Sequence, residues 1–221
     1  MLERVTDIKT WKRWVLSLNN QTYYNYIDKK TIPIVFIHGV GLDHKMWSPQ
    51  INYFKNFSTI TYDLLGHGRT PFKKEEIKMN DYVEQLLSII EFLKLEKINL
   101  VGFSIGSLIA LNFASDFQNK LNSLTLIATT YKRTSEQRQA VIDRVNLAKL
   151  NKPISQLAMK RWFTDEYLKK NPIIYEEFTK ILTKDGEDQK NFIKAYELFA
   201  HYKDDLEKIK KINTKTLVMT G

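Results

Sequence analysis

Apolar and polar residues alternate in two different ways along the first 130 residues of the chain. Short, almost continuously apolar runs are typical of strands covered on both faces of a parallel sheet. Longer stretches repeat apolar residues at helical spacing, most clearly over residues 80–95, where Asn80 or Asp81 is the expected helix cap. The apolar runs predict strands over residues 22–28, 32–39, 58–63, 98–104 and 124–129.

Strands that alternate with helices predict an α/β fold with a doubly wound, mostly parallel sheet. The uncharged stretch over residues 98–115 has the length of a membrane span, but it contains two glycines at a turn and several polar side chains. We interpret it as a buried strand followed by a buried helix.

The pattern changes after Thr130, where about seventy residues show helical spacing and no strand signal. Helical stretches over 135–150, 154–163, 172–182 and 191–202 are separated by Pro153, Pro172 and the segment 184–188. Residues 214–221 then restore a strand. The insertion predicts a helical lid after the strand at 124–129, so we divide the chain into a core over 1–130, a lid over 131–205 and a return to the core over 206–221.

Composition narrows the classes of function. The net charge is +9, but lysines stand beside glutamates throughout, which is typical of a solvated surface and not of a nucleic-acid or membrane site. The sequence contains no cysteine, which excludes thiolate metal sites. Residues 1–15 lack the apolar core of a signal peptide. We therefore expect a cytoplasmic globular protein without nucleic-acid or membrane partners, and the oligomeric state is left open.

Residues 102–106, Gly-Phe-Ser-Ile-Gly, lie between a predicted strand and a predicted helix. In a G-x-S-x-G motif the serine occupies a sharp strand-to-helix turn, and small residues two places before and after it let the strand and helix approach. Gly102 and Gly106 meet that requirement. Ser104 is therefore the candidate nucleophile.

Residues 38–41, His-Gly-Val-Gly, directly follow another predicted strand. Attack on an ester carbonyl creates an oxyanion that two convergent backbone N–H groups stabilise. We expect these donors to be the amides of Val40 and Ile105, with Gly39 and Gly41 bordering the substrate.

A third glycine-rich segment, Asp-Leu-Leu-Gly-His-Gly-Arg-Thr over residues 63–70, reaches the same edge of the predicted sheet. In this order and spacing the three motifs resemble the α/β-hydrolase superfamily, from about Thr22 to Gly221. The lid is similar to that of the 3-oxoadipate enol-lactonase branch, although esterases and carbon–carbon bond hydrolases share much of the pattern. Ser107 and Thr70 depart from the family's usual glycine and serine.

The resemblance implies hydrolysis of a small ester or lactone through an acyl-enzyme on Ser104, without a metal or cofactor. It also implies an acid and then a histidine, in that order, after the strand over residues 214–221. We expect both groups, with one more strand and helix, to lie beyond Gly221. The alternative is a catalytically inactive hydrolase-fold protein that binds a small molecule.

Other residues of interest each have a structural and a functional interpretation. His38 is expected to fix the oxyanion loop. His44 and His67, on loops near the edge of the sheet, and His201, in the lid, are conceivable bases, but we expect surface or packing residues because the sequence shows no partner that would orient them. Three residues of the lid are candidates for substrate binding. Trp162 and Phe163 could form an apolar wall of the pocket, with core packing as the alternative. Arg133 could anchor a carboxylate of the substrate, with a solvated surface position as the alternative.

Overall fold

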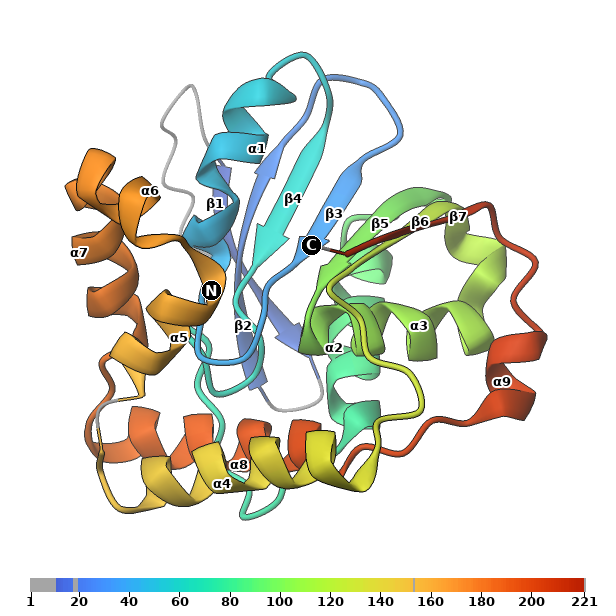
Figure 1. The fold of residues 1–221 in the computed structure, drawn as a ribbon. Coiled ribbons are helices and arrows are strands. Elements are labelled where there is room, and N and C mark those ends of the chain that lie inside the picture. Colours follow the sequence, from blue (N-terminus) through green and yellow to red (C-terminus); the bar gives the residue numbers. More distant parts are fainter. Residues whose placement is uncertain (1–10, 18–19, 153, 221) are drawn as a thin grey trace.

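The computed structural model of the protein describes residues 11–17, 20–152 and 154–220. This part of the chain forms a seven-stranded sheet in the order β1-β2-β4-β3-β5-β6-β7 (Figure 1). Strands β3 to β7 run parallel, whereas β2 pairs antiparallel with β1 and β4. The strands are β1 (Trp11–Ser17), β2 (Asn20–Ile27), β3 (Ile34–Ile37), β4 (Thr59–Tyr62), β5 (Ile98–Phe103), β6 (Leu121–Ile127) and β7 (Thr216–Met219).

Helices α2 and α3 pack against each other, and α3 lies on β5 and β6. In the described part of the chain, six helices follow β6 before the chain returns to β7. Among them α4 and α8 run side by side, on the side to which β3 and β4 deliver their carboxyl ends (Figure 1). The helices are α1 (Ser48–Tyr53), α2 (Met79–Phe92), α3 (Ile105–Phe117), α4 (Ser135–Lys149), α5 (Ser155–Trp162), α6 (Asp165–Lys170), α7 (Pro172–Leu182), α8 (Gly186–His201) and α9 (Leu206–Lys210), with short 3₁₀ turns η1 (His44–Trp47) and η2 (Gln118–Lys120).

The core follows from the apolar runs in the sequence. Val35, Ile60 and Leu100, from β3, β4 and β5, are completely buried. The uncharged stretch over 98–115 forms β5 and most of α3, as interpreted from its glycines. In the part of the chain that the structure describes, no helix is both long and apolar enough to cross a membrane.

Several boundaries differ from the sequence-based expectation. β1, α1, α6 and α9 were not predicted, and β6 begins at Leu121 instead of residue 124. The expected cap of α2 is wrong: the helix begins at Met79, and the Asp81 carboxylate accepts a hydrogen bond from the Lys78 amide at 2.8 Å. α8 begins at Gly186 within the expected break, because the acidic residues of its first turn suit a helix N-terminus.

The junction between β5 and α3 is the tightest backbone contact near the edge of the sheet. A Cβ on Gly102 would lie 2.5 Å from the Gly106 carbonyl carbon and 2.7 Å from the Ser107 Cα. A Cβ on Gly106 would lie 2.6 Å from the Ile37 carbonyl oxygen. Both glycines of the G-x-S-x-G motif are therefore required by packing, and they bring the ends of β3, β5 and α3 together.

We predict that Gly102→Ala lowers the free energy of unfolding by about 3 kcal/mol, because backbone atoms cannot move out of the way as a flexible side chain would. Gly186→Ala is the control, since its φ is +48° but nothing lies within 4 Å of the added Cβ. That variant is expected to lose only about 1 kcal/mol. Urea unfolding of both variants measures the difference, and equal losses would contradict the packing argument.

Candidate active site

Ser104 is the single residue between β5 and α3, and its backbone conformation is strained, with φ +56° and ψ −119°. Such a backbone costs about 1–3 kcal/mol for a residue other than glycine, so it persists only when its surroundings fix it. The Ser104 amide donates to the Ile127 carbonyl at 2.9 Å. Its carbonyl accepts from the Ser107 amide at 2.9 Å and from the Ser107 hydroxyl at 2.5 Å. The serine that departs from the family's usual glycine thus helps to hold the turn.

The loop after β3 runs directly beside Ser104. A Cβ on Gly39 would lie 3.4 Å from the Ser104 Cβ and 2.9 Å from the Phe103 ring, so only glycine lets this loop come so close. Among the described residues, neither the Val40 amide nor the Ile105 amide donates a hydrogen bond. The Ile105 amide is free because it belongs to the first residue of α3. Two backbone donors are therefore available beside the serine.

His38 ties the loops after β3 and β4 together. Its Nε2 accepts from the Leu64 amide at 3.0 Å, so its Nδ1 carries the proton and donates to the Gly39 carbonyl at 2.8 Å. Burial lowers the pKa of this imidazole below 6.5 and keeps it neutral. Both ring nitrogens are engaged, so His38 cannot accept the proton of Ser104 as it lies.

Asp63 is a fully buried carboxylate at the carboxyl end of β4. One oxygen accepts from the His44 amide at 2.8 Å and from His44 Nδ1 at 2.7 Å, and the other accepts from the Arg69 amide at 2.9 Å. Burial alone would raise the pKa of Asp63, but the hydrogen bonds and the charge of His44 hold it below its ordinary value. The carboxylate joins the first turn of η1 to the glycine-rich loop after β4.

His67 lies in that glycine-rich loop, with its ring centroid 5.3 Å from that of His38. Its Nδ1 donates to the Leu65 carbonyl at 3.1 Å, and its buried Nε2 has no hydrogen-bond partner among the described residues. Burial lowers the pKa of His67 to about 3. The imidazole is therefore neutral at physiological pH.

The structure brings none of the four histidines of the sequence into hydrogen-bond contact with Ser104, as far as the described residues extend. His38, His44 and His67 are engaged with the loops around them, and His201 is exposed near the end of α8. The acid and base that the resemblance implies are not identified among these side chains.

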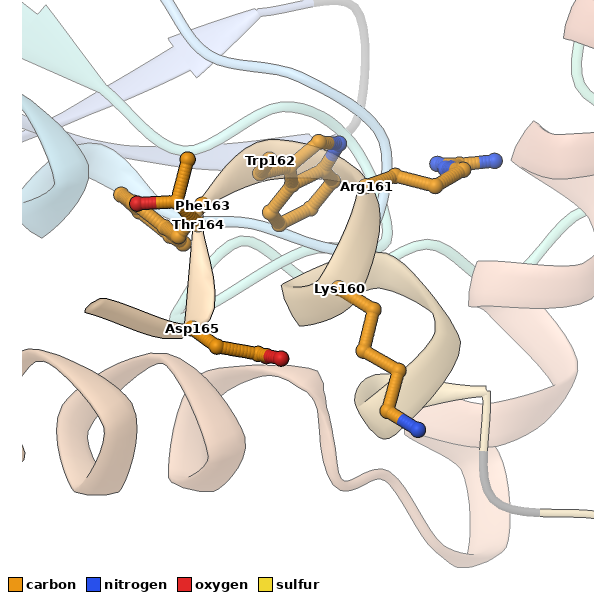
Figure 2. A pocket seen from close by; sticks show the side chains of 6 residues that line it. All are labelled: Lys160, Arg161, Trp162, Phe163, Thr164 and Asp165. Carbon is orange, nitrogen blue, oxygen red and sulfur yellow. The ribbon is translucent and has the colours of Figure 1, made fainter. Parts of the chain in front are cut away.

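Trp162 and Phe163 belong to an aromatic cluster between the helices and the core. Trp162 lies 6.3 Å and Phe163 5.5 Å from the Phe178 ring, and the cluster also contains Leu42 and Phe103, the neighbour of Ser104. An open pocket of about 430 Å³ is lined by residues 160–165 at the connection of α5 and α6 (Figure 2). None of its lining residues belongs to the loops beside Ser104.

Arg133 binds the end of α8. Its guanidinium donates to the Phe199 carbonyl at 2.6 Å and stacks 4.8 Å from the centroid of the Phe199 ring. Arg138 donates to the Ala200 and Tyr202 carbonyls at 3.2 and 2.9 Å. Cations suit the last carbonyls of a helix, so both arginines stabilise this helix terminus.

The sequence-based interpretation missed the role of Asp63 and its partner His44. The available signal was a carboxylate immediately after an apolar strand, at the edge where the other motifs were expected. Gln85 was also missed: its amide donates to the Thr22 hydroxyl and the Asp63 carbonyl, and its oxygen accepts from the Leu65 amide. A glutamine on the apolar face of a predicted helix is a signal for such a buried polar contact.

A mostly parallel sheet with a serine on a strained strand-to-helix turn, beside two free backbone amides, defines the nucleophile-elbow class of α/β proteins. The sequence model for the alpha/beta hydrolase fold matches residues 32–219. The chain belongs to the α/β-hydrolase family.

Individual relatives agree with this assignment. The chain is 31% identical over 208 residues to the (E)-2-((N-methylformamido)methylene)succinate hydrolase of Acinetobacter baylyi, covering 92% of this chain and 76% of the relative. It is 28% identical to 3-oxoadipate enol-lactonase 1 of the same organism, covering 85% and 70%. Its fold is similar to that of the enol-lactonase from Burkholderia xenovorans, with a TM-score of 0.84 and 21% identity over 95% of this chain and 81% of that one.

The buried neutral His67 predicts a specific acid instability. Its pKa of about 3 in the folded protein lies below its ordinary value of 6.5, so the unfolded chain gains a proton between these values that the folded protein does not. His67 therefore costs the folded state about 2 kcal/mol when the pH falls from 7 to 5. Replacing it with glutamine, which does not titrate, should remove that part of the loss.

Urea unfolding of the wild type and His67→Gln at pH 7 and pH 5 measures this difference. His201→Gln is the matched control, because His201 is exposed, and it should keep the wild-type pH dependence. If His67→Gln loses as much stability between the two pH values as the wild type, the neutral buried imidazole is ruled out.

Proposed function

We propose that the protein is a serine hydrolase that cleaves a small carboxylic ester or lactone through an acyl-enzyme on Ser104. The observation that carries this proposal is the position of Ser104 on a strained turn beside the unpaired amides of Val40 and Ile105. One relative is named as an enol-lactonase, which supports a lactone as the substrate. The other is named as a hydrolase of a succinate derivative that carries a formamido group, which supports hydrolysis of a small molecule but not an ester in particular.

In the proposed reaction the Ser104 oxygen attacks the carbonyl carbon, and the resulting oxyanion accepts hydrogen bonds from the Val40 and Ile105 amides. The tetrahedral intermediate collapses, the ester C–O bond breaks, and the leaving oxygen takes up the proton that serine lost. Water then attacks the acyl-enzyme, releases the carboxylic acid and restores the serine hydroxyl. No metal or cofactor takes part in this scheme.

The scheme requires a base. Both ring nitrogens of His38 are engaged, and neither His44 nor His67 makes a hydrogen bond to Ser104 among the described residues. In their described positions none of the three imidazoles is placed to take the serine proton. Without an oriented base, the free amides and substrate binding are expected to supply about 1,000- to 10,000-fold acceleration over water. We expect slow but Ser104-dependent hydrolysis from the 221-residue chain.

We further propose that residues 131–205 act as a lid over the serine. The aromatic cluster supports this role, because Trp162 and Phe163 share it with Phe103 next to the serine. In this arrangement Gly39 and Gly41 border the substrate and the two aromatic rings close its apolar side. Arg133 is engaged with the end of α8, so its proposed part in binding a carboxylate has no geometric support.

The experiment is hydrolysis of p-nitrophenyl acetate by the wild type, Ser104→Ala and Ser115→Ala. Ser115 lies on α3 and donates only to groups of its own helix and its neighbour, so its removal is the matched control. We expect Ser104→Ala to lose the initial release of p-nitrophenolate that accompanies acylation, leaving only the slow rate that the amides and substrate binding supply, and Ser115→Ala to retain that release. Equal rates for all three proteins would contradict a catalytic Ser104.

A rate equal to that of an intact hydrolase would contradict the expectation that no base is oriented toward Ser104. It would require such a base within the chain. The alternative, a small-molecule binder without catalysis, makes a different forecast. It requires no Ser104-dependent turnover, together with ligand binding that survives Ser104→Ala.

A further inference from the structure

Two neighbouring residues of α8 contact the two glycine-containing loops beside the proposed site. A Cβ on Gly41, in the loop after β3, would lie 2.8 Å from the Phe192 ring. A Cβ on Gly66, in the loop after β4, would lie 2.9 Å from the Asn191 Cβ. Adjacent residues of a helix point about 100° apart, so both loops lie against one side of α8. Both side chains are buried, with exposed fractions of 5% for Asn191 and 4% for Phe192.

The backbone of both glycines is left-handed, with φ +76° at Gly41 and +75° at Gly66. A residue with a Cβ is strained in this conformation, and at either position its Cβ would also meet α8. The helix therefore packs on the backbone of each loop, without an intervening side chain.

The segment that carries the Val40 amide depends on packing. Among the described residues, the backbone groups of Val40 and Gly41 form no hydrogen bond with other backbone groups. The Leu42 amide donates to the Gly39 carbonyl at 3.2 Å and closes a turn around them. The Phe192 ring is the nearest neighbour of a Cβ placed on Gly41. Its contact therefore limits how far this turn can move.

The loop after β4 is tied to α8 by hydrogen bonds as well as by packing. The Asn191 amide donates to the Phe72 carbonyl at 3.2 Å, and its oxygen accepts from the Lys194 ammonium at 3.3 Å. The same ammonium donates to the Lys74 carbonyl at 2.9 Å and lies 5.8 Å from the centroid of the Phe72 ring. Residues one turn apart on α8 thus hold the segment that follows Gly66.

Helix α4 holds α8 independently of these loops. The Gln189 side chain donates to the Ala148 carbonyl at 2.9 Å, and Arg144 Nε donates to the Tyr196 hydroxyl at 2.9 Å. The two helices also pack along each other (Figure 1). Since α8 is fixed by α4, it can act as a rigid support for the loops.

We propose that Phe192 and Asn191 are positioning residues: these neighbouring side chains of α8 hold the loops after β3 and β4 and thereby fix the Val40 amide beside Ser104. The Phe192 ring packs on the residue that directly follows Val40, so loss of this contact displaces the amide. The contacts do not depend on any reaction, whereas the importance of the Val40 amide rests on the proposed function.

The first test compares Phe192→Leu with Phe199→Leu by hydrogen exchange and thermal unfolding. Phe199 is the matched control, because it is buried on the same helix seven residues later and its ring stacks with Arg133 instead of a loop glycine. Both variants are expected to lower the Tm by about 4 °C. Only Phe192→Leu should speed exchange of the Leu42 amide, by about tenfold.

The second test examines the other loop with Asn191→Ala, which keeps the Cβ at Gly66 and removes both hydrogen bonds of the amide. The reporters are the Gly66 and Thr70 amides, which donate within the loop at 3.0 and 2.9 Å. We expect about tenfold faster exchange of both. Gln189→Ala is the control, because it removes a bond from α8 to α4 and none to the loops, and it should leave both amides unchanged.

A double-mutant cycle separates the direct contact from general destabilisation. Phe192→Leu removes the ring atom nearest to a Cβ at position 41, so its loss in Tm combined with Gly41→Ala must be smaller than the sum of the single losses. Gly41→Ala and Phe199→Leu should add.

Three results would overturn the proposal: additive losses for Gly41→Ala with Phe192→Leu, unchanged Leu42 exchange in Phe192→Leu, or equal acceleration in Phe192→Leu and Phe199→Leu. If Phe192→Leu does not fold, Asn191→Ala decides, since unchanged exchange of Gly66 and Thr70 would also overturn the proposal.

Kinetics test the link to the proposed oxyanion hole. Phe192→Leu should lower kcat for ester hydrolysis about tenfold and change KM by less than about twofold, because a displaced Val40 amide weakens only the transition state. Phe199→Leu should change neither constant while it remains folded. A change in KM alone, or faster Leu42 exchange with an unchanged kcat, would contradict this link and leave the proposed hydrolysis intact.

A wild type without Ser104-dependent turnover would contradict the proposed function and, with it, the role of the Val40 amide. The exchange measurements need no turnover, so they still decide whether α8 holds the two loops.

Discussion

The arrangement of the site depends on one steric constraint, the backbone contact at the end of β5. Gly102 touches the first turn of α3, and Gly106 touches the carbonyl of Ile37 at the end of β3. With both contacts made, the intervening residue has no alternative to a strained turn, and Ser104 adopts it. The position of the loop beside it follows as well, since Gly39 contacts both Phe103 and Ser104.

Buried polar groups then determine how the loops around the serine are held. His38 is neutral and bridges two loops through hydrogen bonds at both ring nitrogens, whereas Asp63 is charged and bridges them through amide donors. A neutral group and a charged group are each stable in the interior only when their hydrogen bonds are satisfied. The order of the loops therefore comes from this network and from the helices α7 and α8 that cover it.

The sequence predicted those structural features that depend on residues close together along the chain. The central strands follow from apolar runs, and the turn at Ser104 follows from two glycines four residues apart. β1 was missed because Lys12 and Arg13 interrupt its apolar pattern. The contact between His44 and Asp63 joins residues nineteen positions apart and depends on which strands become neighbours. Asn191 reaches the loop after β4, where its amide donates to the Phe72 carbonyl, only because the chain folds back between α7 and α8, which no local pattern reveals.

The central claim is that Ser104 is a nucleophile by virtue of its backbone position. Exposure of the protein to a fluorophosphonate, followed by peptide mapping of the adduct by mass spectrometry, tests it most directly. The account predicts a single dominant adduct on the peptide that contains Ser104, and its loss in Ser104→Ala. No adduct, or modification spread equally over other serines such as Ser107 and Ser115, would contradict it.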